Sequence, residues 1–436
     1  MRTHLAVGLV VGLAASAMAG TTYWVAPPPA GDDANPGTAG QPWATLQHAA
    51  DLVLAGDTVI VRSGSYAGFQ VTTSGSSTDP ITFRADDGAT VSITADNPFT
   101  DDGINIEGGD WIVIEGFTVN GRTRAGIRAV LCSHVTIRDN ACDANEFWGI
   151  FTGFCDDLLI EDNRTSNSLV EHGIYVSNSG DRPVIRGNLI VGNHANGIHM
   201  NGDASQGGDG IISDAVVENN IIRDNGAGGG SGINCDGVQD SLIRNNLIVD
   251  SHASGISLYR IDGGGPSTGN RVLNNTVLVA VDGRWALNVR DGSIGTTLRN
   301  NVFFSEHSFR GAMSVCSTCL TGFDSDHNAV EDRFTLDDGD SVLTLAQWRT
   351  QTGQDAASFA VTPSGLFHDP PDDYHPSATS SLLDAGELRA DVPTDLEGTP
   401  RPLGVTHDLG AYEGTGVIFT DGFETENTSR WSHTAP

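Results

Sequence analysis

Apolar and polar residues alternate in short segments that recur along the middle of the chain. In the segments 149–153, 173–177 and 197–201, a glycine and an isoleucine are followed by alternating inward and outward positions. This alternation is typical of a β-strand with one buried face. Successive segments begin 23, 23, 24, 24, 35, 23, 31 and 26 residues apart, by subtraction of the numbers of their first residues. A period in the low twenties predicts a solenoid. The small residues that begin the segments are Gly103, Gly126, Gly149, Gly173, Gly197, Gly232, Gly255, Ala286 and Ala312.

A second column consists of asparagines, each with an aliphatic residue three positions before it. Asparagine tolerates the left-handed backbone conformation that a sharp bend between strands requires. Its amide can also bond equivalent amides in the coils above and below. We therefore expect a bend in each coil that is held by a ladder of amides. The members of the column are Asn140, Asn163, Asn188, Asn220, Asn246, Asn275 and Asn301.

Charges alternate along the outward position two residues before these asparagines. Stacked coils would bring each residue of this column about 4.8 Å from the next, so opposite charges would face each other. A slip of one residue would scramble the alternation, and the column therefore indicates the register. Its members are Glu115, Arg138, Glu161, Arg186, Glu218 and Arg244.

Three short strands per coil, one bend held by asparagine and no helical period describe a parallel β-helix. The pattern G-I-x-V…I-x-x-N-x-I resembles the right-handed parallel β-helix repeat of the pectate-lyase-like superfamily. The resemblance implies an all-β fold: a three-sheet solenoid of about ten or more coils. We also expect a capping helix near the N-terminus, because residues 43–55 have apolar positions at helical spacing. Such a resemblance indicates the fold but not the function.

The patterns divide the chain into five segments. Residues 1–19 are interpreted as a signal peptide, because a short apolar run precedes Ala17-Met18-Ala19, a cleavage-like site. The C-terminal section contains 408–413, Asp-Leu-Gly-Ala-Tyr-Glu, and resembles exported bacterial choice-of-anchor β-helix proteins, which implies structural closure. The other segments are 20–102 (cap and first irregular coils), 103–319 (regular β-helix), 320–414 (irregular coils and cap) and 415–436 (tail).

The chain is strongly acidic and contains no lysine. It has 23 basic residues, all arginine, against 55 acidic ones, for a net charge of −32. This charge argues against nucleic acid and anionic membranes as partners. A polyanionic polysaccharide would also be repelled, unless Ca²⁺ or a local arginine patch inverts the field. With no later transmembrane run, we expect a secreted monomer, which is extracellular, periplasmic or attached to the cell surface.

Export permits disulfide bonds between the six cysteines. Cys132 and Cys155 each lie six residues after the glycine of their coil, so they would stack at the strand spacing. Cys316 and Cys319 form a second expected pair within one tight loop. Cys142 and Cys235 occupy inward positions four coils apart, so we expect buried free thiols.

In pectate-lyase-like proteins the groove over one strand stack is the usual substrate site, and the resemblance points to the outward columns of this chain. Aromatic rings stack on sugar faces, and polar groups bond hydroxyls. Insertions at 201–214 and 259–270 would raise walls beside the groove. The histidines His172, His194 and His252 are interpreted as turn residues. The candidate catalytic residues are Tyr175, His199, Asp236 and Arg260, and the candidate substrate-binding residues are Arg128, Phe151, Asn201, Asp203, Asn234, Tyr259 and Arg290.

Three functions remain open at this point. The first is β-elimination on a uronate, with His199 or Tyr175 as base or acid and Arg260 or Arg128 neutralising the carboxylate. Several β-helix lyases use lysine, which this chain lacks, so that mechanism does not transfer unaltered.

The second function is glycoside hydrolysis, for which Asp236 would pair with Asp203 or Asp209. The third is a non-catalytic surface or adhesion module that binds glycan. We interpret the chain as an exported carbohydrate-active protein that cleaves polysaccharide. No metal site is expected, although Ca²⁺ could assist as a cofactor. The acidic loops at Asp32–Asp33 and 369–375 are interpreted as turns.

Overall fold

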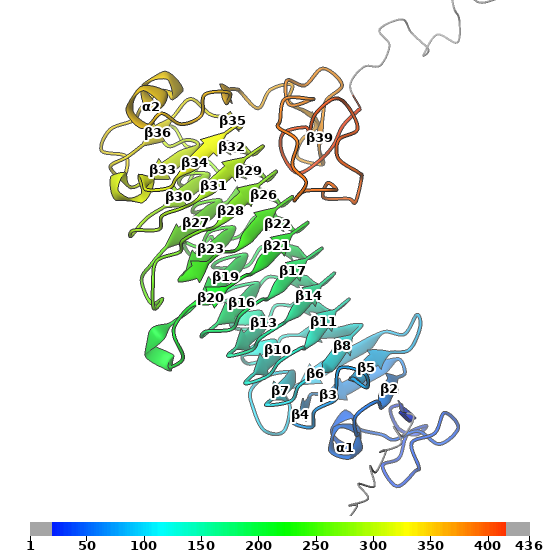
Figure 1. Cartoon of the computed structure of the whole chain (residues 1–436). Coiled ribbons are helices and arrows are strands. Elements are labelled where there is room, and N and C mark those ends of the chain that lie inside the picture. Colours follow the sequence, from blue (N-terminus) through cyan, green and yellow to red (C-terminus); the bar gives the residue numbers. More distant parts are fainter. Residues whose placement is uncertain (1–19, 416–436) are drawn as a thin grey trace, which may run out of the picture.

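The computed structural model describes residues 20–415, which form a long β-solenoid (Figure 1). The expected signal peptide, and all but the first residue of the expected tail, lie outside the described residues. Three parallel sheets of 12, 11 and 12 strands wind around one core. The expected three-sheet parallel β-helix is therefore confirmed. The boundaries drawn between its segments stay predictions.

Each regular coil contributes one strand to each sheet. Sheet 1 contains β1 (Thr22–Val25), β2 (Thr58–Val61), β5 (Ile81–Ala85), β8 (Ile112–Glu115), β11 (Thr136–Arg138), β14 (Leu159–Glu161), β17 (Val184–Arg186), β21 (Val216–Glu218), β25 (Leu242–Arg244), β28 (Arg271–Leu273), β31 (Thr297–Arg299) and β34 (Asp324–Asp326). Sheet 2 contains β3 (Gly64–Ala67), β6 (Val91–Ala95), β9 (Phe117–Asn120), β12 (Ala141–Asp143), β15 (Arg164–Ser166), β18 (Leu189–Val191), β22 (Ile221–Arg223), β26 (Leu247–Ser251), β29 (Thr276–Val279), β32 (Val302–Ser305), β35 (Ala329–Val330) and β37 (Phe359–Ala360).

Sheet 3 carries the glycine–isoleucine segments. It contains β4 (Phe69–Val71), β7 (Ile104–Glu107), β10 (Ala125–Val130), β13 (Trp148–Gly153), β16 (Ile174–Ser177), β19 (Ile198–Asn201), β23 (Ile233–Asp236), β27 (Ile256–Tyr259), β30 (Leu287–Val289), β33 (Met313–Val315) and β36 (Phe334–Thr335). Tyr175 pairs with His199, and His199 pairs with Asn234 in the next strand. The vertical register read from the sequence is therefore correct.

The core is a column of aliphatic side chains stacked coil on coil. Ile127, Ile150, Ile174, Ile198 and Ile233 occupy the same inward position of sheet 3, and each is fully buried. Burial of apolar surface along this column stabilises the solenoid. The glycine before each isoleucine leaves no room for a larger residue. A Cβ added to Gly149 would lie 2.7 Å from the carbonyl oxygen of Gly173.

The asparagine ladder is present and runs one coil further, to Asn328. The backbone N–H of Asn163 donates to Oδ1 of Asn188 at 3.0 Å, and its Nδ2 donates to the same oxygen at 3.1 Å. One detail of the expectation is wrong. The left-handed conformation belongs to the residue before each ladder asparagine, such as Asn219 (φ 56) and Asn245 (φ 52), and not to the ladder residue itself.

The column of alternating charges forms ion pairs across sheet 1. Arg138 lies 2.7 Å from Glu115, Arg186 lies 2.6 Å from Glu161, and Arg244 lies 2.5 Å from Glu218. Exposed pairs of this kind contribute little to stability. Their agreement with the sequence pattern shows that the register was read correctly.

A helix lies at each end of the solenoid, and a folded lobe packs against the side of its C-terminal coils (Figure 1). Helix α1 (Leu46–Leu52) begins at Thr45, whose side chain accepts from the N–H of His48, and it is shorter than the expected 43–55. Helix α2 (Leu345–Thr352) covers the other end, where Trp348 stacks on Phe334 with ring centroids 5.1 Å apart. The small strands β38 (Phe367–Asp369) and β39 (Asp373–Pro376) belong to a C-terminal lobe, which shares an apolar cluster with side chains of the sheet 2 strands β26, β29, β32 and β35.

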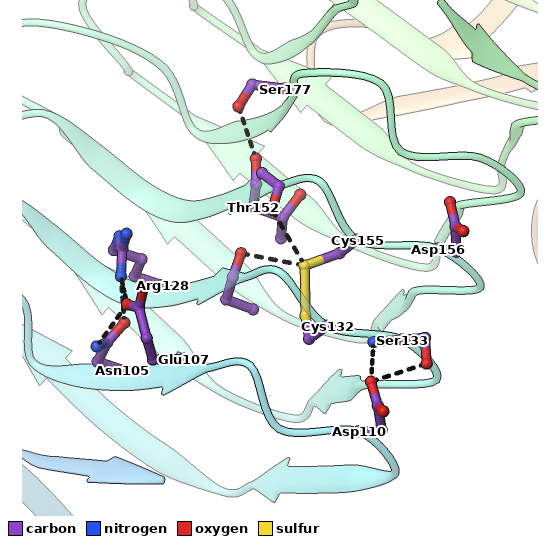
Figure 2. The surroundings of a disulfide bond; sticks show 12 residues. Asn105, Glu107, Asp110, Arg128, Cys132, Ser133, Thr152, Cys155, Asp156 and Ser177 are labelled. Carbon is purple, nitrogen blue, oxygen red and sulfur yellow. Dashed lines mark hydrogen bonds and ion pairs between the residues drawn. A yellow bond between two sulfur atoms is a disulfide. The ribbon is translucent and has the colours of Figure 1, made fainter. Parts of the chain in front are cut away.

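The cysteines behave as expected. Cys132 and Cys155 form a disulfide between adjacent coils, with Cα atoms 4.7 Å apart (Figure 2). Cys316 and Cys319 form the second disulfide beside the short helix η2 (Ser317–Leu320). Cys142 and Cys235 are free and buried.

Candidate functional site

An aromatic stripe runs along the outward face of sheet 3. It begins at Trp148, whose ring centroid lies 4.6 Å from that of Phe151. Phe151 lies 5.5 Å from Tyr175, which in turn stacks on the ring of His199 at 4.9 Å. All four rings are partly exposed, and Phe151, Tyr175 and His199 occupy the same outward position of the successive strands β13, β16 and β19. Such a row of ring faces suits the apolar faces of sugar rings.

Two histidines form a hydrogen-bonded pair at the end of this stripe. The backbone N–H of Asn196 donates to Nδ1 of His172 at 3.1 Å. Nδ1 of His172 is therefore an acceptor, and the neutral ring carries its proton on Nε2. That Nε2 lies 2.9 Å from Nδ1 of His199 and donates to it. His199 therefore carries its own proton on Nε2.

This geometry changes the role expected for His199. Burial lowers its pKa to about 4, and burial and the neighbouring His199 lower the pKa of His172. Both rings are therefore neutral at neutral pH. The lone pair of His199 Nδ1 is occupied by His172, so His199 cannot act as a base through that atom. Its buried Nε2 atom has no hydrogen-bond partner within residues 20–415.

His172 is the residue that the sequence interpretation missed. It does lie in the turn before β16, as expected, but its ring is buried and also lies 3.3 Å from a carboxylate oxygen of Glu171. The other two turn histidines behave differently. His194 is exposed, and His252 bridges Asp224 and Asp282 at 3.0 and 2.9 Å on the surface. The spacing of 27 residues between His172 and His199, close to one coil, was the available signal.

Two tyrosine hydroxyls face the groove with an amide bonded to each. Nδ2 of Asn201 donates to the hydroxyl of Tyr175 at 3.3 Å, and Nδ2 of Asn234 donates to the hydroxyl of Tyr259 at 2.7 Å. Burial raises the pKa of both tyrosines, so both phenols keep their protons at neutral pH. The amides occupy one lone pair of each oxygen and leave the O–H available to a ligand.

The carboxylate of Asp236 is enclosed by the protein, so its proposed catalytic role stays a prediction that this geometry does not favour. It is 1% exposed. Its Oδ1 accepts from the N–H groups of Ile261 and Gly263 at 2.9 and 3.0 Å, and its Oδ2 accepts from the N–H of Asp262 at 2.8 Å. The insertion after β27 folds back over the end of β23 and encloses the carboxylate. Asp236 therefore holds the wall of the groove.

The two insertions, which were expected to raise walls beside the groove, join each other into one wall. The N–H of Ala204 donates to the carbonyl of Asp262 at 2.9 Å, and the N–H of Gly264 donates to that of Gly210 at 2.7 Å. The first insertion contains the short helix η1 (Ala204–Gln206) and β20 (Ile212–Ser213), which pairs with β24 (Val238–Gln239). The wall therefore connects three successive coils.

The acidic residues of the first insertion bond their own loop. Oδ1 of Asp203 accepts from the N–H and hydroxyl of Ser205 at 3.1 and 2.6 Å, and Oδ1 of Asp209 accepts from the N–H of Ile211 at 2.9 Å. With Asp236 enclosed, the structure does not provide the expected pair of carboxylates for hydrolysis.

Arg128 and Arg260, proposed as neutralising groups, and Arg290, proposed to bind substrate, all have partners within the protein. Arg128 donates to Oδ1 of Asn105 at 2.7 Å and pairs with Glu107, so its charge is already compensated (Figure 2). Arg260 is exposed on the wall, where its Nε donates to the carbonyl of Gly263 at 3.2 Å. Arg290 pairs with Asp338 but also lines a pocket in the groove.

This pocket of about 370 Å³ extends from Asn196, just before β19, past β23 and β27 to Arg290, just after β30. It brings Asn234, Tyr259 and Arg290 together as expected. It also contains residues that were not selected from the sequence: Asn196, Ser257, Arg284 and Asn288. Ser257 and Asn288 belong to the same outward column as His199. The residue types in that column do not show which members line a pocket and which are simply exposed to solvent. Within residues 20–415, no group of three or more His, Cys, Asp or Glu residues is placed to hold a metal ion.

The comparison with family models decides the family. The model described as the Pel9A-like right-handed β-helix region matches residues 23–255, which is more than half of the chain. The chain belongs to this Pel9A-like family. A second model, for the periplasmic copper-binding protein NosD, matches residues 203–315. Both matches end before the C-terminal section, so its resemblance to choice-of-anchor proteins stays a prediction.

Two solved structures share the Pel9A-like fold over most of their length. Pectate lyase Pel9A is similar with a TM-score of 0.62 and 17% identity, over 91% of this chain and 97% of that one. XylC in complex with xylose is similar with a TM-score of 0.57 and 12% identity, over 91% and 99%. At sequence identities this low, the structural similarity shows a common fold alone.

A curated relative, the uncharacterized protein YwoF of Bacillus subtilis (strain 168), is 32% identical over 125 residues. The match covers 26% of this chain and 27% of YwoF, so the chain spans about a quarter of the length of that relative.

The Pel9A-like match covers the aromatic stripe but only part of the pocket. Its last residue, Gly255, directly precedes β27. Tyr259, Arg284, Asn288 and Arg290 all lie beyond it. No helix in the described part of the chain is long and apolar enough to cross a membrane.

Proposed function

We propose that this Pel9A-like protein is an exported enzyme that cleaves a polysaccharide lying along sheet 3. The observation that carries the proposal is the pocket at the end of the aromatic stripe, where Tyr259, Asn234 and Arg290 meet. The stripe would hold sugar rings by stacking, and the pocket would hold the sugar beside the bond that breaks. Pectate lyase Pel9A and the xylose complex of XylC, which share the fold, support a carbohydrate ligand.

The site favours elimination over hydrolysis. Hydrolysis requires two carboxylates on opposite sides of the glycosidic bond, and Asp236 is committed to the wall. Elimination requires a group that takes the proton from C5 of a uronate, and a cation beside the uronate carboxylate. Tyr259 and Arg290 line the same pocket and can fill these two roles, with the uronate carboxylate taking the place of Asp338 beside Arg290.

The proposed step requires the deprotonated form of Tyr259, which becomes more populated as the pH rises into the alkaline range. This phenolate takes the proton from C5, a double bond forms between C4 and C5, and the bond between C4 and O4 breaks. The proton then passes from Tyr259 to the departing O4 oxygen. Asn234 donates to the tyrosine oxygen at 2.7 Å and favours the phenolate, while Arg290 stabilises the charge that develops on the carboxylate.

A polysaccharide panel tests this function. The mature chain is incubated with uronate polymers and neutral glycans, with and without Ca²⁺, and the products are followed by size-exclusion chromatography and ultraviolet absorbance. We expect shortened chains that carry the unsaturated chromophore. Shortened chains without the chromophore would replace elimination by hydrolysis. Binding without shortening would assign the groove to a glycan-binding module.

A further inference from the structure

Two stacked arginines lie just beyond the proposed reaction pocket. Arg284 lies two residues before Ala286, and Arg310 lies two residues before Ala312. Both alanines are small residues that begin a sheet 3 segment. Both pairs are 26 residues apart, which is one coil at this point of the solenoid. Strands β30 and β33 are paired in register here. The repeat itself therefore places the two arginines in adjacent coils on the same side of the groove.

These arginines line a second pocket of about 240 Å³ that continues the first. Arg284, Asn288 and Arg290 line both pockets, so the groove is continuous from Tyr259 to Arg310. The outward side chains of β30 and β33, Asn288 and Ser314, also line the second pocket and provide neutral hydrogen-bonding groups. An extended ligand could therefore occupy both pockets at once.

The charge of the second pocket is positive, in contrast to the rest of the chain. Asp338 lines the pocket and pairs with Arg290, and Glu331 pairs with Arg333. Within residues 20–415, no carboxylate lies within 4.0 Å of the guanidinium of Arg284 or Arg310. The guanidinium of Arg310 donates one hydrogen bond within the described residues, to the carbonyl of Gly283 at 2.9 Å. Burial and the nearby Arg284 lower the pKa of Arg310.

Two close guanidinium groups without a carboxylate repel each other, and an anion between them would remove that repulsion. Guanidinium groups bind carboxylate and sulfate oxygens through paired, charge-assisted hydrogen bonds. We propose that the pocket between Arg284 and Arg310 is a subsite for an anionic substituent of a sugar, either a carboxylate or a sulfate ester. The subsite rests on the proposed function and defines its substrate class as an acidic glycan.

Binding measurements on the full mature chain test the subsite. The variant Tyr259→Phe serves as a background, because slow cleavage lets calorimetry measure binding alone. The ligands are a hexameric oligogalacturonate, its carboxyl-reduced neutral form and a sulfated galactan oligosaccharide. We expect Arg284→Gln and Arg310→Gln each to weaken binding of an acidic ligand about tenfold, an effect of the size of one charge-assisted hydrogen bond. Binding of the neutral form should not change.

The control variant is Arg164→Gln. Arg164 is exposed on sheet 2, away from the groove, and the substitution changes the net charge equally. If Arg284→Gln and Arg310→Gln weaken binding of the uronate ligand alone, the subsite binds a carboxylate. If they weaken binding of the sulfated ligand alone, the subsite binds a sulfate. Equal effects on acidic and neutral ligands, or no effect on either acidic ligand, overturn the proposal. Cleavage of a uronate polymer at a rate that is insensitive to both substitutions would leave the proposed cleavage standing without the subsite.

Discussion

The Nε2 atom of His172 lies 2.9 Å from Nδ1 of His199, and the backbone N–H of Asn196 holds the other nitrogen of His172. The backbone N–H of Asn196 fixes the tautomer of His172, and His172 in turn fixes the tautomer of His199. His199 stacks flat on Tyr175, with 14° between the ring planes. The pair therefore orients the aromatic stripe at the point where it meets the pocket, and the role of His172 is to position its neighbour.

The histidine pair predicts a loss of stability in mild acid. The folded-state pKa of His199 is about 4, below the unfolded value of 6.5, so the unfolded chain binds the proton more readily. The stability is present above about pH 6.5 and is lost as the pH falls toward about 4, by up to about 3 kcal/mol. Chemical denaturation of the wild type and His199→Gln across this range measures the difference between their pH profiles.

The effect of His199 is the difference between the pH profiles of the wild type and the variant, because other groups also titrate in this pH range. Burial raises the pKa of Asp408 to about 6, and burial lowers that of His407 to about 4. Both belong to the C-terminal lobe and are unchanged in the variant. Parallel pH profiles for the wild type and His199→Gln would contradict the assignment of a buried neutral imidazole.

Asp236→Ala should destabilise the wall without acting on the chemical step directly. The substitution leaves three backbone N–H groups of 261–263 without an acceptor, which costs about 2–5 kcal/mol. Hydrogen exchange should show faster exchange in the wall loop, and denaturation should show a lower midpoint. Asp209→Asn is the control, since that carboxylate is exposed. If Asp236→Ala abolished activity while exchange and stability stayed at wild-type values, the carboxylate would be catalytic after all.

The fold could be predicted from the sequence because the solenoid repeats one local pattern. Every coil brings the same residue types to the same place, so Tyr175, His199 and Asn234 could be stacked by counting alone. The ladder asparagines were found in the same way. The left-handed conformation occurs one residue earlier than expected, because the bend and the amide ladder require different backbone conformations at neighbouring residues.

The site could be predicted only in part, because its chemistry depends on segments that break the repeat. Asp236 occupies an outward column, yet a loop that follows it by about 25 residues folds back and encloses it. His172 lies in a turn whose path the repeat does not specify. Arg284 and Arg310 do follow the repeat, but the interpretation considered only columns within the strands.

Tyr259→Phe should reduce cleavage strongly while the fold remains intact. The substitution removes the oxygen that transfers the proton, an effect of about 10²–10⁴ in rate for general acid–base catalysis. Because burial raises the pKa of Tyr259, the wild-type rate should increase with pH into the alkaline range as the phenolate forms. Initial rates of ultraviolet absorbance against pH measure both effects.

Tyr66→Phe is the matched control, because it removes a phenol oxygen far from the groove, where Tyr66 donates to the carbonyl of Arg62 at 2.7 Å. That variant should retain the wild-type rate. Comparable rates for Tyr259→Phe and the wild type would exclude Tyr259 as the proton-transfer group, and Tyr175 would then be tested in the same way.

Two residues separated by one position should differ sharply in their contribution to stability. Asn188 is buried in the ladder, where it donates to Asn220 Oδ1 at 3.0 Å and to the carbonyl of Ile160 at 2.9 Å. Asn188→Ala leaves several buried groups without partners and should cost about 2–4 kcal/mol. Arg186→Ala removes an exposed ion pair with Glu161 and should cost less than about 1 kcal/mol.

Equilibrium denaturation of the two variants measures this difference directly. The buried amide cannot turn to water when its neighbour is lost, whereas both charges of the surface pair are solvated again at once. Salt should reduce the small effect of Arg186→Ala and leave that of Asn188→Ala unchanged, because only the former is a screened Coulomb interaction. Equal costs for the two substitutions would mean that the charge column, and not the amide ladder, keeps the coils in register.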